Sequence, residues 1–150
     1  MPDWTLVATS HFILLPTIAY LNAHEYVCAG LVFGTYLTSI AHHSTKPAYP
    51  WVLYTDMTFV QIANLCALYT TMKSLPYSLP LYVCFLSCPL TVYYYGHRYS
   101  MFAWDPDPII STRWHAFLQM FTSCSSTVCI LVTTLTQALG HSKTLHSHSA

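Results

Sequence analysis

Four polar residues set in apolar stretches are the candidates for chemistry in this sequence. Ser39 and His43 are four residues apart, which places them on one face of a helix. Asp56 lies early in the next apolar stretch, and His115 lies early in the last one. An ionisable side chain inside a membrane span is costly and is a functional hypothesis by default. The set therefore indicates an active site, a structural cluster whose members bond one another, or a proton path.

The elements that must position these residues are long apolar stretches separated by polar or proline-bearing breaks. Each stretch has about the 20 residues that a helix needs to cross a bilayer. The predicted spans are 4–22, 26–43, 51–72, 77–96 and 113–139. The runs are too long and too uniformly apolar for strands of a membrane barrel. The sequence therefore predicts an all-α, polytopic transmembrane helical bundle.

The breaks divide the chain into one domain and a short tail. NAHE (22–25), HSTKPAYP (43–50), KSLP (73–76) and the stretch 97–112 separate the spans, and the DPDP of the last break resists both helix and strand. Pro16 is expected to kink the first span. Gly140 is a plausible helix C-cap, so we predict a transmembrane domain over 1–140 and a polar His/Ser-rich tail over 141–150.

Composition supports a membrane location and excludes several classes of partner. The hydrophobic residues make up 54% of the chain and the charged residues only 7%, whereas soluble domains carry about 25% charged residues. The formal net charge is zero and no basic patch exists, so nucleic acid is not an expected partner. The sequence also lacks GxSxG, HExxH and a Gly-rich phosphate loop.

The tryptophans share one side of the predicted bundle. With five spans, the N-terminus and the second and fourth breaks lie on the same side of the membrane. All four tryptophans fall there, and we call this side the tryptophan end: Trp4, Trp51, Trp104 and Trp114. Tryptophan favours the headgroup layer, which supports the span assignment. The four polar candidates fall at the same level, near this end.

The pattern of these residues resembles the CREST superfamily of membrane proteins. Ser39-x-x-x-His43, then Asp56 early in the next helix, then Trp114-His115 opening the last helix carry the resemblance. The superfamily includes alkaline ceramidases, adiponectin-type receptors and lipases that remodel GPI anchors. The resemblance implies that His43 and His115 are zinc ligands. It also implies that Ser39 and Asp56 orient a metal-bound water for hydrolysis of a lipid amide or ester.

The sequence departs from the superfamily in two ways. The superfamily has an HxxxH pair on its last helix; with His115 as the second histidine, the first position falls on Ser111. Only two histidines then remain, where catalytic zinc sites usually have three protein ligands. The chain also has five predicted spans where the superfamily has seven.

The interpretation we favour is a small non-catalytic integral-membrane accessory subunit of a larger membrane protein complex. Its expected partners are other membrane protein subunits and structural lipids, with no cofactor, and the mitochondrial inner membrane is one candidate location. The alternative is a CREST-like zinc-dependent lipid hydrolase. A third reading is a redox or transport subunit that uses Asp56 and the histidines as a proton path.

Overall fold

The computed structural model describes residues 3–45, 49–73 and 78–147, and this part of the chain contains helices and no strands. The elements are α1 (Trp4–Ser10), the 3-10 turn η1 (His11–Ile13), α2 (Leu14–Asn22), α3 (Tyr26–Ser44), α4 (Pro50–Met72), α5 (Ser78–Tyr99), the 3-10 turn η2 (Phe102–Trp104) and α6 (Pro108–Ser147). The prediction of an all-α fold is therefore confirmed. The predicted breaks at 43–50 and 73–76 fall partly on residues 46–48 and 74–77, outside the described residues.

The first predicted span is helical throughout but changes its winding in the middle. Asp3 caps α1 by accepting a hydrogen bond from the Leu6 amide at 3.3 Å. The 3-10 turn η1 then separates α1 from α2, just before Pro16. Proline has no N–H, and its ring collides with the carbonyl four residues earlier, which here belongs to Phe12. The tighter turn at Phe12 accommodates the proline, and the expected kink stays a prediction.

The last helix is longer at both ends than the sequence indicates. It begins at Pro108, not at 113, because proline suits the first turn of a helix and Asp107 caps it. The Asp107 side chain accepts a hydrogen bond from the Ile109 amide at 2.8 Å. At the other end the helix continues through Gly140 to Ser147, so Gly140 is not a helix C-cap, and the predicted domain boundary at 140 stays a prediction. Glycine inside a helix costs only about 1 kcal/mol, which the neighbouring helical residues offset. Residues 148–150 lie outside the described part.

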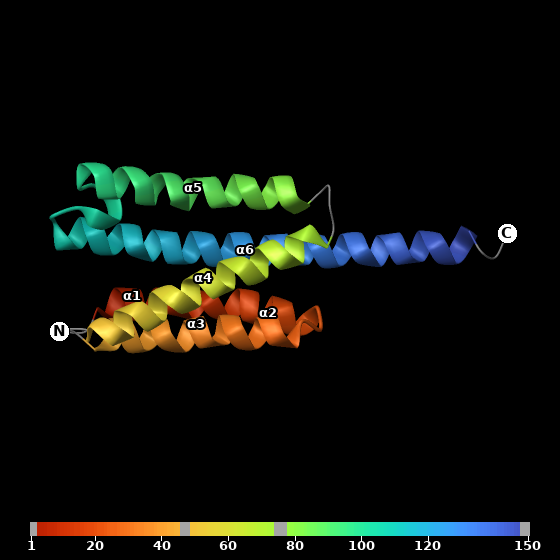
Figure 1. Ribbon diagram of the computed structural model, residues 1–150, viewed down its shortest axis with the longest axis horizontal. Coiled ribbons are helices and arrows are strands. Elements are labelled where there is room, and N and C mark those ends of the chain that lie inside the picture. The colour runs from red at the N-terminus through yellow and green to blue at the C-terminus, as the bar shows by residue number, and fades with distance from the viewer. Residues whose placement is uncertain (1–2, 46–48, 74–77, 148–150) are drawn as a thin grey trace.

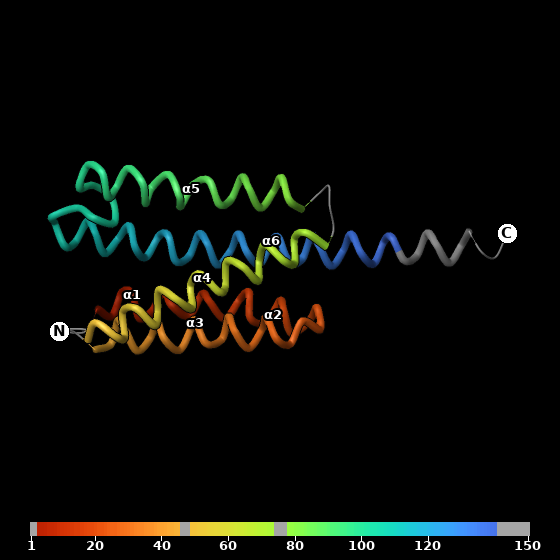
Figure 2. Tube along the Cα trace, viewed as in Figure 1, coloured from red at the N-terminus to blue at the C-terminus, as the bar shows by residue number. Residues whose placement is uncertain are grey.

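Helix α6 is the axis of the arrangement. α5 packs along one side of α6, α1 and α2 pack on the other side with α3 against them, and α4 crosses obliquely while contacting both α3 and α6 (Figure 1). The core between these helices is built from Ile13, Tyr20, Val32, Cys66 and Ile130. The trace in Figure 2 shows that α1, α4 and α6 start, and α3 and α5 finish, at the end of the molecule where the N-terminus lies. This is the tryptophan end of the sequence analysis.

Only some of the helices pass a hydropathy criterion for crossing a membrane. Within the described residues, the stretches Trp4–Asn22 and Pro108–Gly140 are long and apolar enough to do so. α3, α4 and α5 are long enough in residues, but polar residues lower their hydropathy. Asp56, Gln61 and Asn64 all lie within α4, for example. The prediction of five spans is therefore not confirmed by hydropathy alone.

Gly96 allows the chain to fold back after α5. A Cβ atom at this position would lie 2.8 Å from the Met101 carbonyl oxygen and 3.1 Å from the Trp104 ring. We expect Gly96→Ala to lower the free energy of unfolding by about 1–3 kcal/mol, because a backbone atom cannot move aside as a flexible side chain can. Thermal unfolding in detergent measures the change. Gly30→Ala in α3 is the matched control, since nothing lies within 4 Å of its Cβ position; an equal loss in both variants would contradict the contact.

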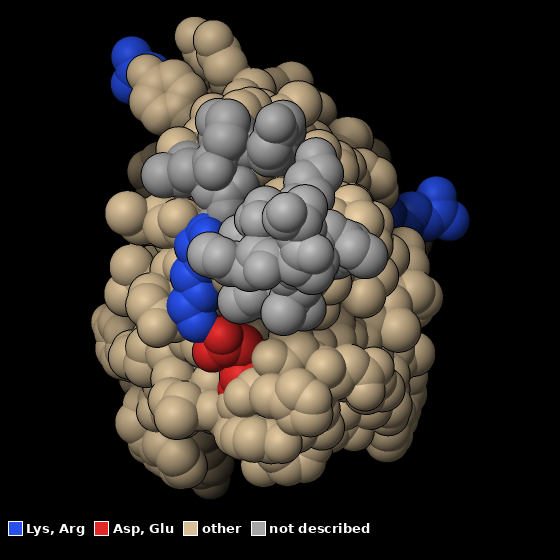
Figure 3. Space-filling view, turned by 90° about the vertical axis from the view of Figure 1, so that its right-hand side faces the viewer, with Lys and Arg blue, Asp and Glu red and all other residues tan. Residues whose placement is uncertain are grey.

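An ion pair joins the α2–α3 turn to the end of α4. The Lys73 ammonium donates a hydrogen bond to the Glu25 carboxylate and lies 4.4 Å from the centre of the Tyr69 ring. In Figure 3, one basic group at the end opposite the tryptophan end touches an acidic one. The hydrogen bond to Glu25 raises the pKa of Lys73 above its ordinary value of 10.5.

This raised pKa predicts a dependence of stability on pH. A lysine whose pKa is higher in the folded state adds stability that is complete below its unfolded pKa and is lost as the pH rises through the folded pKa. We therefore expect Lys73→Gln to lower stability at pH 8 by at most about 1 kcal/mol, since the pair is partly exposed. The difference between wild type and variant should shrink above about pH 10.5. Thermal unfolding across pH measures it, and Glu25→Gln should give the same loss at pH 8. A difference that persists at high pH would contradict the ion pair.

Candidate functional site

Asp56 is the centre of a buried hydrogen-bonded group at the tryptophan end. One oxygen of its carboxylate, Oδ1, accepts a hydrogen bond from Ser39 Oγ at 2.6 Å and another from Thr38 Oγ1 at 3.1 Å. Ser39 is 2% exposed and Asp56 is 8% exposed. The donors come from the last turns of α3 and the acceptor from the second turn of α4. The bonds therefore join two helices that the sequence separates by a proline-bearing break.

Gln119 forms a second group that joins three helices. Its side-chain oxygen accepts a hydrogen bond from Thr9 Oγ1 of α1 at 2.6 Å. Its nitrogen lies 3.1 Å from Nε2 of His43 in α3, and 3.4 Å from the buried Ser10 hydroxyl. An amide nitrogen can only donate, so the His43 Nε2 is the acceptor in this pair. Gln119 on α6 thus holds α1 and α3 together.

Further polar contacts close the same end of the bundle. The Asp3 amide donates a hydrogen bond to the His43 carbonyl at 3.1 Å. The Asp3 carboxylate accepts one from Thr112 Oγ1 at 2.9 Å, while its other oxygen caps α1. The start of α1, the end of α3 and the start of α6 are therefore fixed to one another.

His115 lies on the same helix as Gln119 but makes different contacts. Its Nδ1 is 3.3 Å from the Ser111 carbonyl, and its half-buried ring lies 6.2 Å from the centre of the Trp104 ring at a tilt of 40°. The Ser111 hydroxyl donates to the Ala103 carbonyl at 2.7 Å and so anchors η2 to α6. His115 and Gln119 are four residues apart and share a face of α6.

The structure brings together some of the predicted site residues and adds others. Ser39 and Asp56 are bonded directly, and His43 lies one helical turn beyond Ser39 on α3. Gln119 of α6 bonds His43, although the resemblance placed the HxxxH pair at Ser111 and His115. Gln119 was missed although it carries two signals: it is a polar residue within an apolar run, and it lies four residues after His115.

The described residues around His43 do not make a complete zinc site. Zinc in proteins is held by cysteine, histidine and carboxylate side chains. The His43 Nε2 faces the Gln119 amide, and His42 is adjacent, with ring centroids 4.8 Å apart. Within the described residues, no group of three or more His, Cys, Asp and Glu side chains is placed to hold a metal ion. We therefore derive no chemical step from a metal at this position.

Comparison with known proteins adds no constraint on these residues. Searches against protein families, curated protein sequences and solved structures find no match to this chain.

Proposed function

We propose that this chain is a small non-catalytic integral-membrane accessory subunit of a larger membrane protein complex, with five membrane-spanning helices. One observation carries the proposal. The buried polar groups at the tryptophan end are used in bonds between helices, as the Gln119 contacts with Thr9 and His43 illustrate. Polar side chains that bond across helices are typical of packing inside a membrane.

The outer surface supports the same proposal. Large apolar side chains that are more than half exposed lie on α3, α4, α5 and α6: Leu37, Tyr54, Met57, Val83 and Leu135. Monomeric soluble proteins rarely expose so much contiguous apolar surface. Lipid or apolar partner helices on all these faces would cover it, and this favours five spans although hydropathy selects two.

Native electrophoresis tests the assembly. The chain, expressed at its natural level and extracted with a mild detergent, should migrate in an assembly of fixed size that contains other membrane subunits. A monodisperse single chain, stable without any partner, would refute the proposal. Fractionation of organelles tests the candidate location in the mitochondrial inner membrane.

Labelling from either side of the membrane tests the five spans. Single cysteines introduced at Asp105 and at Lys73, in a chain whose own cysteines are replaced, should react from opposite sides. Labelling of both positions from the same side would exclude an odd number of spans between them.

The alternative is a CREST-like zinc-dependent hydrolase of a lipid amide or ester. The hydrogen bond of 2.6 Å between Ser39 and Asp56 favours it, since the resemblance pairs these residues. Elemental analysis of the purified protein separates the two proposals. One equivalent of zinc, lost in both His43→Ala and His115→Ala, would favour the hydrolase, and metal-free protein would exclude it.

A further inference from the structure

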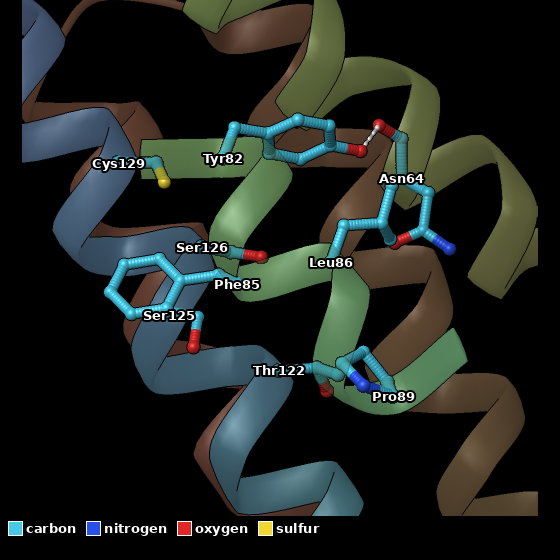
Figure 4. Close-up of a pocket in the computed structure, with 9 residues that line it drawn as sticks. All are labelled: Asn64, Tyr82, Phe85, Leu86, Pro89, Thr122, Ser125, Ser126 and Cys129. Carbon is cyan, nitrogen blue, oxygen red and sulfur yellow. Dashed lines mark hydrogen bonds between the residues drawn. The ribbon is translucent and has the colours of Figure 1, made fainter. Parts of the chain in front are cut away.

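A groove opens between α4 and α5 and is floored by α6 (Figure 4). It is a shallow depression of about 20 Å³ that is open on one side. Its lining residues come from all three helices: Asn64 from α4; Tyr82, Phe85, Leu86 and Pro89 from α5; and Thr122, Ser125, Ser126 and Cys129 from α6. The hydroxyl of Tyr82 donates to the Asn64 carbonyl at 3.1 Å and ties the two walls together. The groove begins one turn along α6 from Gln119, since the Thr122 hydroxyl donates to the Gln119 carbonyl at 3.3 Å.

Several polar groups that line the groove have no partner in the described part of the chain. Ser125 is only 8% exposed, yet its hydroxyl makes no hydrogen bond with any described residue. The Ser126 hydroxyl and the Asn64 side-chain amide likewise make no hydrogen bond with any described residue. Pro89 also has no N–H to donate to the Phe85 carbonyl, four residues earlier. The groove therefore presents both donors and acceptors, all of them uncharged.

The position of the groove decides what can satisfy these groups. Pro89 is near the middle of α5, about 15 Å from either end at 1.5 Å per residue. In a chain with five spans, this is the hydrocarbon core, which offers neither headgroups nor bulk water. A lipid acyl chain could fill the groove but could not bond Ser125 or Asn64. A protein side chain can do both.

The floor of the groove suits a close approach by another helix. Thr122, Ser126 and Cys129 are spaced four and three residues apart, so they lie on one face of α6 with Ser125 beside them. Small residues with this spacing let two helix backbones approach closely inside a membrane. The aromatic ring of Phe85 and the side chain of Leu86 form an apolar wall.

We propose that this groove is the docking site for one transmembrane helix of another subunit. The docked helix presents an uncharged hydrogen-bonding side chain (serine, threonine, asparagine or glutamine) to Asn64 and Ser125. The inference rests on the proposed function, because it names the contact through which the accessory subunit joins its complex.

Filling the groove tests the inference in the intact complex. Ser126→Phe should reduce the amount of chain recovered in the assembly about tenfold, which corresponds to the loss of one modest helix contact. Asn64→Leu removes the free amide without adding bulk and should reduce recovery by a smaller factor. Cys124→Phe is the matched control, because Cys124 is exposed on the same helix and does not line the groove. Thermal unfolding of each purified variant shows whether the chain itself still folds.

A diazirine amino acid in place of Leu86 identifies the occupant. It should crosslink to one membrane subunit of the complex, whereas the same group at the exposed Val83 should crosslink mainly to lipid. Crosslinks from position 86 to lipid only, or to a second copy of this chain, would overturn the inference. If the assembly forms and both groove variants leave it intact, the inference fails while the proposed function stands. If no assembly forms with the wild-type chain, both fail.

Discussion

Gln119→Leu should lower the free energy of unfolding by about 2–4 kcal/mol, the largest effect expected of any single substitution in this chain. Leucine fills a similar volume but offers no hydrogen bond. The buried His43 imidazole loses its donor at 3.1 Å, and the Thr9 hydroxyl keeps only the carbonyls of Thr5 and Leu6 as acceptors. A buried polar group left without its partner costs about 1–3 kcal/mol. Thermal unfolding of the purified chain in detergent measures the loss.

The same substitution elsewhere on α6 gives the control. Gln137 is exposed, and no hydrogen bond to its side chain is formed by any described residue. Gln137→Leu should therefore change stability by less than about 0.5 kcal/mol. Equal effects at the two positions would show that Gln119 does not join α1 and α3 to α6.

Asp56→Ala should have the second-largest effect, a loss of about 2–3 kcal/mol. The substitution removes the acceptor of two hydroxyl hydrogen bonds, from Ser39 and Thr38. Asp56→Asn keeps one carbonyl oxygen in place, so it should lose less than half as much stability. Unfolding in detergent, measured for both variants, gives the comparison.

A double-mutant cycle that combines Asp56→Ala with Ser39→Ala isolates the free energy of the Ser39–Asp56 hydrogen bond. The coupling between the two positions should be about 1 kcal/mol, the typical net contribution of one hydrogen bond. A coupling near zero would contradict the bond. The Asn variant also separates the functional proposals. An accessory subunit should keep its assembly with Asp56→Asn, whereas a proton path or a hydrolase would lose its activity while the assembly stayed intact.

The helices were largely predictable because each is a long apolar run. The predicted 26–43 and 51–72 agree closely with α3 (Tyr26–Ser44) and α4 (Pro50–Met72). The ends of α6 were not predictable from composition. Pro108 was read as a helix breaker, although at the first turn of a helix a proline lacks only an N–H that would be unpaired anyway. Gly140 was interpreted as a helix C-cap, although nothing in its surroundings requires the helix to end there.

The level of the site residues along the bundle was predictable, but the direction in which each helix turns its side chains was not. Counting residues along α3 and α4 places Ser39, His43 and Asp56 near one end of the bundle, as observed. The partner of His43 depends on how α6 rotates about its axis, and that rotation is set by packing against α1 and α5. A helix turns 100° per residue, so counting along the sequence does not show which face of α6 turns toward His43. The resemblance indicated His115 as the α6 residue close to His43, whereas the observed bond to Gln119 comes from the packing.

The length of α6 has a consequence for the surroundings of the protein. Its 40 residues make a rod about 60 Å long, twice the thickness of a bilayer's hydrocarbon core. To fit within about 30 Å it would have to tilt by about 60°, well beyond the range of about 0–40° that spanning helices adopt. If α6 crosses a bilayer, part of it therefore stands outside as a stalk. In Figure 1 the helix projects past its neighbours at the end opposite the tryptophans. That stalk continues without a break from the segment that carries Gln119, so a force applied to it outside the membrane would act directly on the junction of α1, α3 and α6.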